Sequence, residues 1–189
     1  MSHTTVFICF LIFIIAHFLH PVTSSTPPSS PAANNNLIIV KLGGSCVTNK
    51  SAFEELNEGN LEKFCEQMAS VSSNTVSRHI IVHGAGSFGH FSARQYELVK
   101  GGRDKDWRQG FCETRTSVLK LNTLIVSALT KYKYPGTAVT LFPSARTKNR
   151  VLDKAGPLSM CQSILENHIT PVIHGDAILD ISHRCTIFR

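Results

Sequence analysis

The stretch that decides the fold is His79-Ile80-Ile81-Val82-His83-Gly84-Ala85-Gly86-Ser87-Phe88-Gly89-His90. It begins with an apolar run rich in β-branched residues, which predicts a buried strand over residues 79–82. The run passes directly into closely spaced glycines, and a helix is expected over residues 88–100. Glycine tolerates positive φ and lets backbone N–H groups approach an anion. We therefore expect a strand, a ligand-binding loop and a helix, in that order.

Three other apolar runs predict buried strands, at residues 37–40, 138–142 and 170–173. Apolar residues at helical spacing predict helices at residues 51–72, 106–131 and 158–166. Strands separated by helices need crossover connections, which implies a parallel sheet. The expected fold class is therefore α/β, a three-layer sandwich with a mainly parallel sheet. Ligands of such folds bind at the carboxyl ends of the strands.

Two more glycine-containing segments are expected at that edge of the sheet. Lys41-Leu42-Gly43-Gly44-Ser45 follows the first strand, and Gly175-Asp176 follows the last. Glycines after a strand can turn backbone N–H groups toward a phosphate, and Lys41 and Lys50 supply point charges that can follow a phosphoryl group. Taken alone, a Lys-Gly-Gly segment is more often just a turn. Asp176 is either a turn residue or a group that orients a lysine or a metal-bound nucleotide.

The segment 83–90 admits other interpretations. It contains a literal GxGxxG, but residues 103–107 lack the strand and acidic ending that a dinucleotide-binding unit needs about 20 residues later. Ala85 replaces the first glycine of the GxSxG nucleophile turn. His83 and His90 have no third ligand at a suitable spacing, so no protein metal site is predicted. His90 is either a surface histidine at the start of a helix or a hydrogen-bond donor to a phosphate.

Charge constrains the kind of ligand. The 189 residues carry a formal net charge of +6, which favours anionic partners. Because Lys and Arg are scattered rather than clustered in runs, we expect small phosphorylated ligands and no nucleic acid.

The first 36 residues differ from the rest, since every Lys, Arg, Asp and Glu lies after Asn36. Residues 6–19 form an apolar stretch of signal-peptide length, but no Lys or Arg precedes it. Residues 21–36 are a linker rich in Pro, Ser and Asn. We expect a leader and linker at 1–36 and a folded domain at 37–189. The expected location is cytoplasmic, with entry into the ER membrane or secretory pathway through residues 6–19 as the alternative.

Together the motifs resemble the amino acid kinase superfamily and, within it, the isopentenyl phosphate kinases. The matching segments are residues 41–45 with Lys50, HGAGSFGH at 83–90 and PVIHGD at 171–176. The final His90 is similar to the histidine with which the phosphate-accepting branch holds its substrate. The resemblance covers about residues 37–180. It implies an amino acid kinase-like fold whose C-terminal nucleotide-binding half is missing from this chain.

The resemblance implies transfer of a phosphoryl group from ATP, with Mg²⁺, to isopentenyl phosphate or a similar prenyl monophosphate. The product would be isopentenyl diphosphate, for isoprenoid biosynthesis. The implied catalytic residues are Lys41, Lys50 and His90. The implied ATP-binding residues are Lys41, Leu42, Gly43, Gly44, Ser45, Gly86 and Asp176. The implied substrate-binding residues are Ala85, His90 and Gly175, with Phe91, Tyr96 and the 111–125 face as candidate walls for the apolar tail.

Because the family continues into a second half, we expect weak or absent activity in this chain. The alternative is a catalytically inactive fragment that binds phosphates or a partner chain. A homodimer is a further expectation that the sequence leaves open.

Overall fold

A computed structural model describes residues 36–74, 78–103, 105–156 and 158–188. The expected leader therefore lies almost entirely outside the described residues. Four parallel strands form the central sheet, in the spatial order β1-β2-β6-β3. Their bounds are β1 Leu37–Leu42, β2 Arg78–His83, β6 Thr170–His174 and β3 Gly136–Val139. The expected parallel sheet is confirmed.

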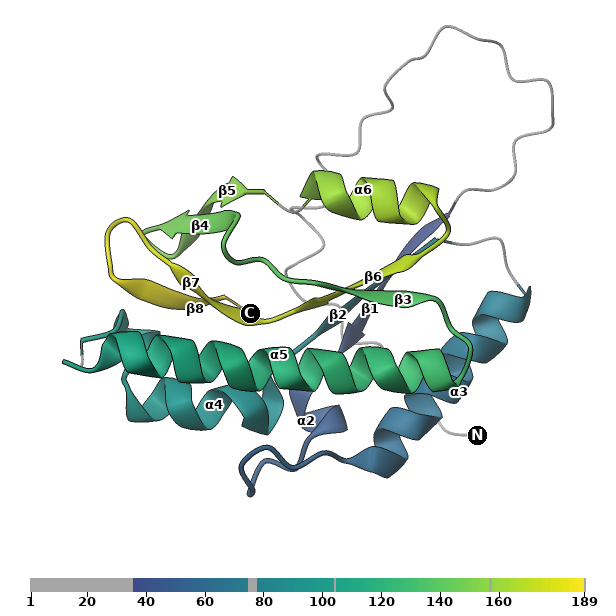
Figure 1. Cartoon of the computed structure of the whole chain (residues 1–189), viewed down its shortest axis with the longest axis horizontal. Helices are drawn as coiled ribbons and strands as arrows, with labels where there is room; N and C mark the ends of the chain where they lie inside the picture. The colour runs from purple at the N-terminus through teal and green to yellow at the C-terminus, as the bar shows by residue number, and fades with distance from the viewer. Residues whose placement is uncertain (1–35, 75–77, 104, 157, 189) are drawn as a thin grey trace, which may run out of the picture.

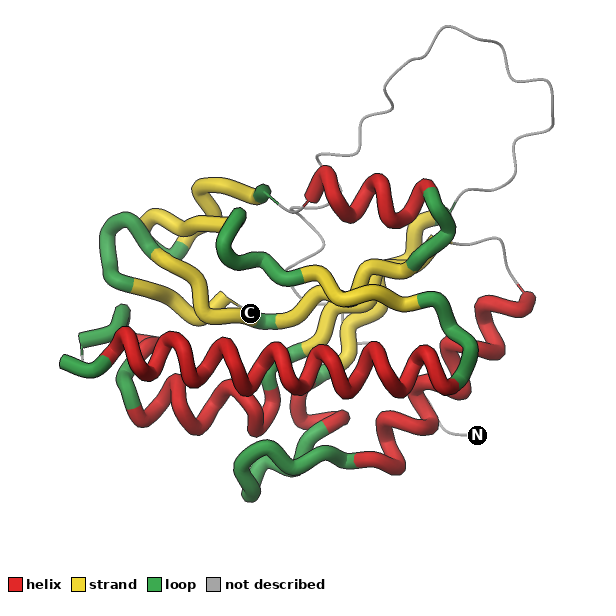
Figure 2. Tube along the Cα trace, viewed as in Figure 1, coloured by secondary structure: helices red, strands yellow, loops and turns green. Residues whose placement is uncertain are grey.

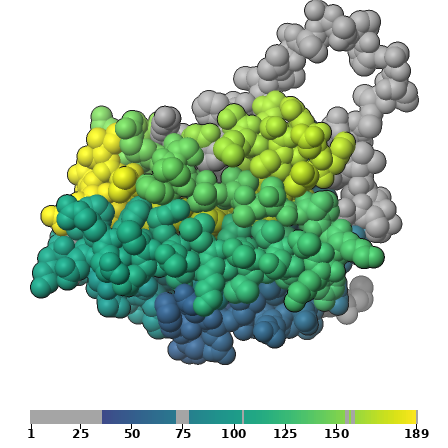
Figure 3. Space-filling view, in the orientation of Figure 1, coloured from purple at the N-terminus to yellow at the C-terminus, as the bar shows by residue number. Residues whose placement is uncertain are grey.

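Helices cover both faces of this sheet, as Figures 1 and 2 show. On one face lie α2 (Gly44–Val47), α3 (Glu58–Asn74), α4 (Gly86–Gln95) and α5 (Trp107–Lys131), and on the other lies α6 (Leu158–Glu166). With side chains filled in, α5 runs across the middle of the molecule, between the blue N-terminal segments and the lime α6 (Figure 3). The three-layer α/β sandwich is confirmed.

The alternation of strand side chains explains the two layers of core. Ile81 and Val172 point to the α3 and α5 side, where they join a cluster that includes Leu121 and Ile125. Their chain neighbours Ile80 and Ile173 point to the other side, where they pack with Cys161 and Leu165 of α6. A strand buried on both faces needs apolar residues at successive positions, as in the runs that identified these strands.

Two antiparallel hairpins were not expected from the sequence. They are β4 (Ala145–Lys148) with β5 (Val151–Ala155), and β7 (Asp176–Leu179) with β8 (Cys185–Phe188). The second hairpin packs against α5 and the short 3₁₀ helix η1 (Leu98–Lys100), where Ala177 and Cys185 join Leu98 and Phe111 in a third apolar cluster. Four-residue strands as polar as Ala145–Lys148 carry too little periodicity to be recognised.

Three expected boundaries were wrong. The helix expected at 51–72 begins at Glu58, because Asn57 caps it by accepting a hydrogen bond from the Asn60 N–H at 3.1 Å. The strand expected at 138–142 spans Gly136–Val139. The helix expected at 88–100 begins at Gly86 and ends at Gln95, and η1 follows it as a separate turn.

No helix in the described ranges has the length and apolarity needed to span a bilayer. The five cysteines in those ranges are free thiols.

Candidate functional site

The three glycine-containing segments meet at one edge of the sheet. Leu42, His83 and His174, the last residues of β1, β2 and β6, lie in register across the three strands. Just beyond them, the Gly84 N–H donates to the Leu42 carbonyl at 3.0 Å, and the Gly175 N–H donates to the His83 carbonyl at 2.9 Å. The expectation that these segments share an edge is confirmed. We call residues 43–45, residues 84–86 and Gly175 the glycine loops.

The first two glycine loops contact each other through their backbones. A Cβ atom built at Gly44 would lie 2.4 Å from the Gly86 nitrogen, and one built at Gly84 would lie 2.9 Å from the Gly44 nitrogen. Gly86 also has a φ of +51°, which favours glycine, and a Cβ there would lie 2.2 Å from Thr48 Oγ1. Glycine is therefore required at these positions for the two loops to approach.

Thr48 joins the same two loops through its side chain, and sequence reasoning missed it. Its buried hydroxyl donates to the Gly44 carbonyl at 2.8 Å and accepts from the Ser87 N–H at 3.0 Å. Thr48 lies outside every motif, and the spacing from Ser87 gives no local signal. Only the folded chain brings a threonine hydroxyl between the two loops.

The loops present backbone N–H groups that can bind an anion. Gly44 and Ser45 begin α2, and Gly86 begins α4. The N–H groups of a helix's first turn have no acceptor within the helix. Gly43, directly before them, has open space where its side chain would be, because a Cβ there would meet nothing within 4 Å. Backbone N–H groups gathered in this way can form a phosphate-binding nest.

Three of the predicted site residues, Lys41, Lys50 and His90, are exposed. Lys41 is exposed near the end of β1, and His90 is exposed on α4, one turn after Gly86. Lys50 is exposed in a loop held by Asn49, whose side-chain oxygen accepts from the Ser51 hydroxyl at 2.7 Å and from the Ser51 N–H at 3.2 Å. Leu42, in contrast, has its side chain buried in the core.

The candidate walls for an apolar tail divide into exposed and buried residues. Phe91 is 41% exposed and meets the 54% exposed Phe53 edge to face, with 5.8 Å between the ring centroids. Tyr96 packs on Gly110, where a Cβ would lie 2.2 Å from the tyrosine ring. Phe111 is buried against Phe142. Of the expected wall, Phe91, which directly follows His90 in the chain, offers an exposed apolar surface, and Leu119 and Leu124 of the 111–125 face are also exposed. The Ala85 methyl group packs toward Gly89.

Asp176 is buried in an ion pair that the sequence did not indicate. Its Oδ2 accepts from Arg115 Nη1 at 2.5 Å and from the Thr140 hydroxyl at 3.3 Å. The Arg115 guanidinium also lies over the Phe142 ring, 4.4 Å from its centroid. Asp176 Oδ1 has no hydrogen-bond partner among the described residues. Arg115 therefore orients the carboxylate, an arginine partner that the sequence did not suggest when it indicated that Asp176 orients a lysine or a metal-bound nucleotide.

Two buried histidines lie beneath the loops. His83 and His174 each place Nδ1 3.0 Å from the carbonyl of the following glycine, so Nδ1 carries the proton and donates. Burial lowers the pKa of His83 to about 4, and it lowers the pKa of His174 as well. Both rings are therefore neutral at pH 7. Their Nε2 atoms are buried without a partner among the described residues.

These features define a class of protein. The family model of the amino acid kinase family matches residues 36–189, and the chain belongs to that family. Isopentenyl phosphate kinase of Arabidopsis thaliana is 30% identical over 184 residues, which covers 79% of this chain and 55% of the relative. Isopentenyl phosphate kinase of Methanothermobacter thermautotrophicus is 36% identical over 155 residues, covering 78% of this chain and 56% of the relative.

Solved structures agree with these relatives. One of isopentenyl phosphate kinase superposes with a TM-score of 0.74 at 31% identity, covering 81% of this chain and 63% of that chain. Aspartate kinase from Synechocystis, at 14% identity and a TM-score of 0.52, shares the fold alone. The chain spans about half the length of the curated relatives that it matches.

Proposed function

We propose that the domain binds the phosphate groups of ATP and of isopentenyl phosphate at the glycine loops, for phosphoryl transfer that yields isopentenyl diphosphate. The observation that carries the proposal is the backbone contact between Gly44 and Gly86, which brings the starts of two helices together at the edge of the sheet. The relatives named isopentenyl phosphate kinase support the choice of substrate. The same proposal assigns residues 37–189 to one kinase domain.

On the ATP side, we assign the phosphates to Lys41, to the backbone of residues 42–45 and to Gly86. Backbone N–H groups and a lysine together neutralise charge without restricting the position of the phosphate to one geometry. Lys50 would follow the phosphoryl group as it moves. Asp176 would act on this side through Arg115, which fixes its carboxylate.

On the acceptor side, we assign the substrate phosphate to the backbone at Ala85 and Gly175 and to the His90 side chain. His90 is exposed on the same helix that Gly86 begins, so it can donate a hydrogen bond to an anion at the loops. Phe91 and Phe53 offer an apolar surface next to it for a short prenyl tail.

The transfer breaks the bond between the γ-phosphorus of ATP and the oxygen that bridges it to the β-phosphorus, and ADP leaves. A new bond forms from that phosphorus to an oxygen of the substrate phosphate. Because this oxygen is already anionic, no strong general base is required, and the protein contributes positioning and charge neutralisation. Among the described residues no three His, Cys, Asp or Glu side chains form a metal site, so Mg²⁺ would be held chiefly by nucleotide phosphates.

The test measures transfer from radiolabelled ATP to isopentenyl phosphate, together with calorimetric binding of isopentenyl phosphate to the 189-residue chain. Lys50→Ala should abolish any transfer. Lys63→Ala, which removes an exposed lysine of α3, is the matched control. Isopentenyl phosphate binding without transfer would favour the inactive phosphate-binding fragment. Absence of both, from a folded sample, would overturn the proposal.

A further inference from the structure

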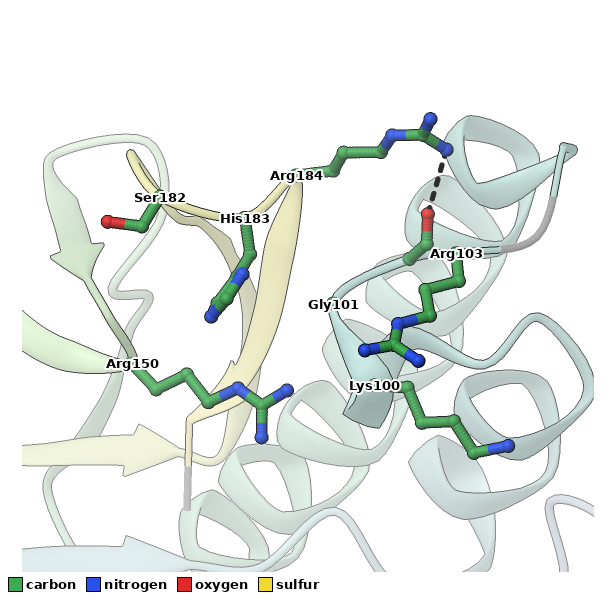
Figure 4. A pocket seen from close by; sticks show the side chains of 8 residues that line it. Lys100, Gly101, Arg103, Arg150, Ser182, His183 and Arg184 are labelled. Carbon is green, nitrogen blue, oxygen red and sulfur yellow. Dashed lines mark hydrogen bonds between the residues drawn. The ribbon is translucent and has the colours of Figure 1, made fainter.

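A concave site lies between the segment around Gly101 and the turn that joins β7 to β8. Its volume is about 520 Å³, within the usual range for small-molecule sites. We call it the arginine pocket, and its lining residues are Lys100, Gly101, Gly102, Arg103, Arg150, Ser182, His183 and Arg184 (Figure 4).

The arginine pocket is separate from the glycine loops. Helix α4 begins at the loops with Gly86 and ends at Gln95, which puts its far end about 15 Å away. Strand β7 begins at Asp176, beside the third loop, and ends at Leu179, about 10 Å further along. The pocket residues follow the far ends of both elements, so a ligand at one site does not touch the other.

The pocket is strongly cationic. Among its eight described lining residues are three arginines, a lysine and a histidine, and none is acidic. Lys100 pairs with Glu97 at 2.6 Å. Within the described part of the chain, neither Arg103 nor Arg150 forms an ion pair. In Figure 4 these two guanidinium groups and the His183 ring point into the space between the Gly101 segment and the β7–β8 turn.

One carboxylate fixes the wall that carries Arg150 and His183. Asp180 is buried, and its Oδ2 accepts from the Arg150 N–H and the Thr147 hydroxyl, both at 2.7 Å. Its Oδ1 accepts from the N–H groups of Ser182 at 2.9 Å and His183 at 2.8 Å. Asp180 therefore ties the turn of the β4–β5 hairpin to the turn of the β7–β8 hairpin and satisfies its own charge without using a cationic side chain of the pocket.

The opposite wall approaches closely because it is made of glycine. Gly101 has a φ of +91°, and a Cβ there would lie 3.2 Å from the His183 Cβ. Gly102 has a φ of +64°, and its carbonyl accepts from Arg184 Nη1 at 3.0 Å. The two walls are thus joined by a direct hydrogen bond, and exposed basic side chains line the concave site between them.

We propose that the arginine pocket binds a diphosphate group. Guanidinium groups on opposite walls can each hold two phosphate oxygens, an arrangement that suits two linked phosphates better than one. Because the site is concave, it suits a small-molecule ligand better than the flat surface of a macromolecule. The inference goes beyond the phosphoryl-transfer function and does not depend on it. The diphosphate can be inorganic diphosphate or the head group of an ester, and isopentenyl diphosphate serves as the probe for the latter.

The experiment titrates inorganic phosphate, inorganic diphosphate and isopentenyl diphosphate into the 189-residue chain by calorimetry. NMR signals of the arginine Nε–Hε groups report where each ligand binds.

We expect inorganic diphosphate to bind at least about tenfold more tightly than phosphate, because it engages both walls. Arg103→Gln/Arg150→Gln should weaken diphosphate binding at least about tenfold, while Lys63→Gln/Lys131→Gln, which removes the same charge elsewhere, should change it less than about twofold. Equal affinities for isopentenyl diphosphate and inorganic diphosphate would identify the head group as the recognised part.

A variant of the glycine loops, Lys50→Ala/His90→Ala, separates this proposal from the proposed function. Diphosphate binding should persist in that variant with the same arginine shifts. Loss of binding there, with retention in Arg103→Gln/Arg150→Gln, would overturn the arginine pocket and leave the phosphoryl-transfer proposal standing. If the double arginine variant does not fold, the single variant Arg103→Gln gives the same test. The Arg103 side chain is exposed, so its replacement should leave the fold intact.

Discussion

Arg115 and Asp176 join the middle of helix α5 to the first residue after the third glycine loop, with 2.5 Å between Nη1 and Oδ2. The Asp176 side chain is fully buried and that of Arg115 is 12% exposed. The pair thus fixes the position of the Asp176 carboxylate immediately beside the candidate site. It also connects the sheet edge to the layer of helices below it.

Replacing Arg115 should destabilise the fold strongly, because Asp176 would be left as a buried charge without its partner. We expect Arg115→Ala to lower the free energy of unfolding by about 3–5 kcal/mol, measured by urea denaturation. Lys120→Ala is the matched control, since Lys120 lies on the same helix and pairs with Glu54 at the surface; it should cost less than about 1 kcal/mol. Similar losses in the two variants would contradict this role of Arg115.

A methyl group at Gly44 should push the first two glycine loops apart. We expect Gly44→Ala to lower the melting temperature and to abolish calorimetric binding of isopentenyl phosphate and ATP, because the Gly86 nitrogen occupies the required space. Gly43→Ala is the control, since a Cβ at Gly43 meets nothing within 4 Å and its melting temperature should be unchanged. If Gly44→Ala is as stable as Gly43→Ala, the close contact is not required.

His90 should contribute a hydrogen-bond donor to the substrate phosphate and little to the fold. We expect His90→Ala to weaken isopentenyl phosphate binding at least about tenfold with no change in melting temperature, because the residue is exposed. His90→Gln should retain part of the affinity, since the amide keeps one donor. Unchanged binding in His90→Ala would remove His90 from the site.

Stability should fall in mild acid because His83 resists protonation in the folded state. Its pKa is about 4 when buried and 6.5 when unfolded, so the unfolded chain binds more protons between these values. His83 alone should therefore lower the free energy of unfolding by roughly 3 kcal/mol as the pH drops from 6.5 to 4, and His174, whose pKa burial also lowers, should add to the decrease. His83→Gln should flatten this part of the profile, whereas His168→Asn, at an exposed histidine, should not. A profile unaffected by His83→Gln would exclude this residue as the cause.

Turnover by the 189 residues alone should be small. In the proposed function the glycine loops contact the phosphates of ATP, but holding the γ-phosphoryl group in line also needs binding energy from the adenosine end of the nucleotide. We expect the chain to bind isopentenyl phosphate and to transfer phosphate far more slowly than the Methanothermobacter thermautotrophicus relative measured under the same conditions. Comparable rates would show that this domain positions the whole nucleotide.

The parts of the fold that follow periodicity were predictable. Runs such as Ile80–Val82 are apolar at successive positions because both faces of the sheet are covered, and glycines after a strand mark its carboxyl end. The hairpins were not predictable, since β4 is short and polar and its pairing with β5 depends on a turn at Asn149 and Arg150, where φ is 50° and 65°. Positive φ values are unusual for residues other than glycine, and no local sequence pattern predicts them here.

The candidate site also divides into features that the sequence predicts and features that only the folded chain shows. The backbone loops were recognisable because their glycines are adjacent in sequence to strands. Thr48, Arg115 and Thr140 were missed because each acts on a residue more than thirty positions away. Such contacts depend on how the layers pack, and a single sequence carries no record of them.

The contact between Gly44 and Gly86 also restricts how this sequence can evolve. A side chain on either residue requires the backbone of the other loop to move, so the two positions cannot change independently. A route to a different loop would need coordinated replacements in both segments, with Thr48 adjusting as well. Efforts to redesign ligand preference at this edge should therefore vary the surrounding residues, such as Phe53 and Phe91, and keep the pair of glycines as the invariant frame.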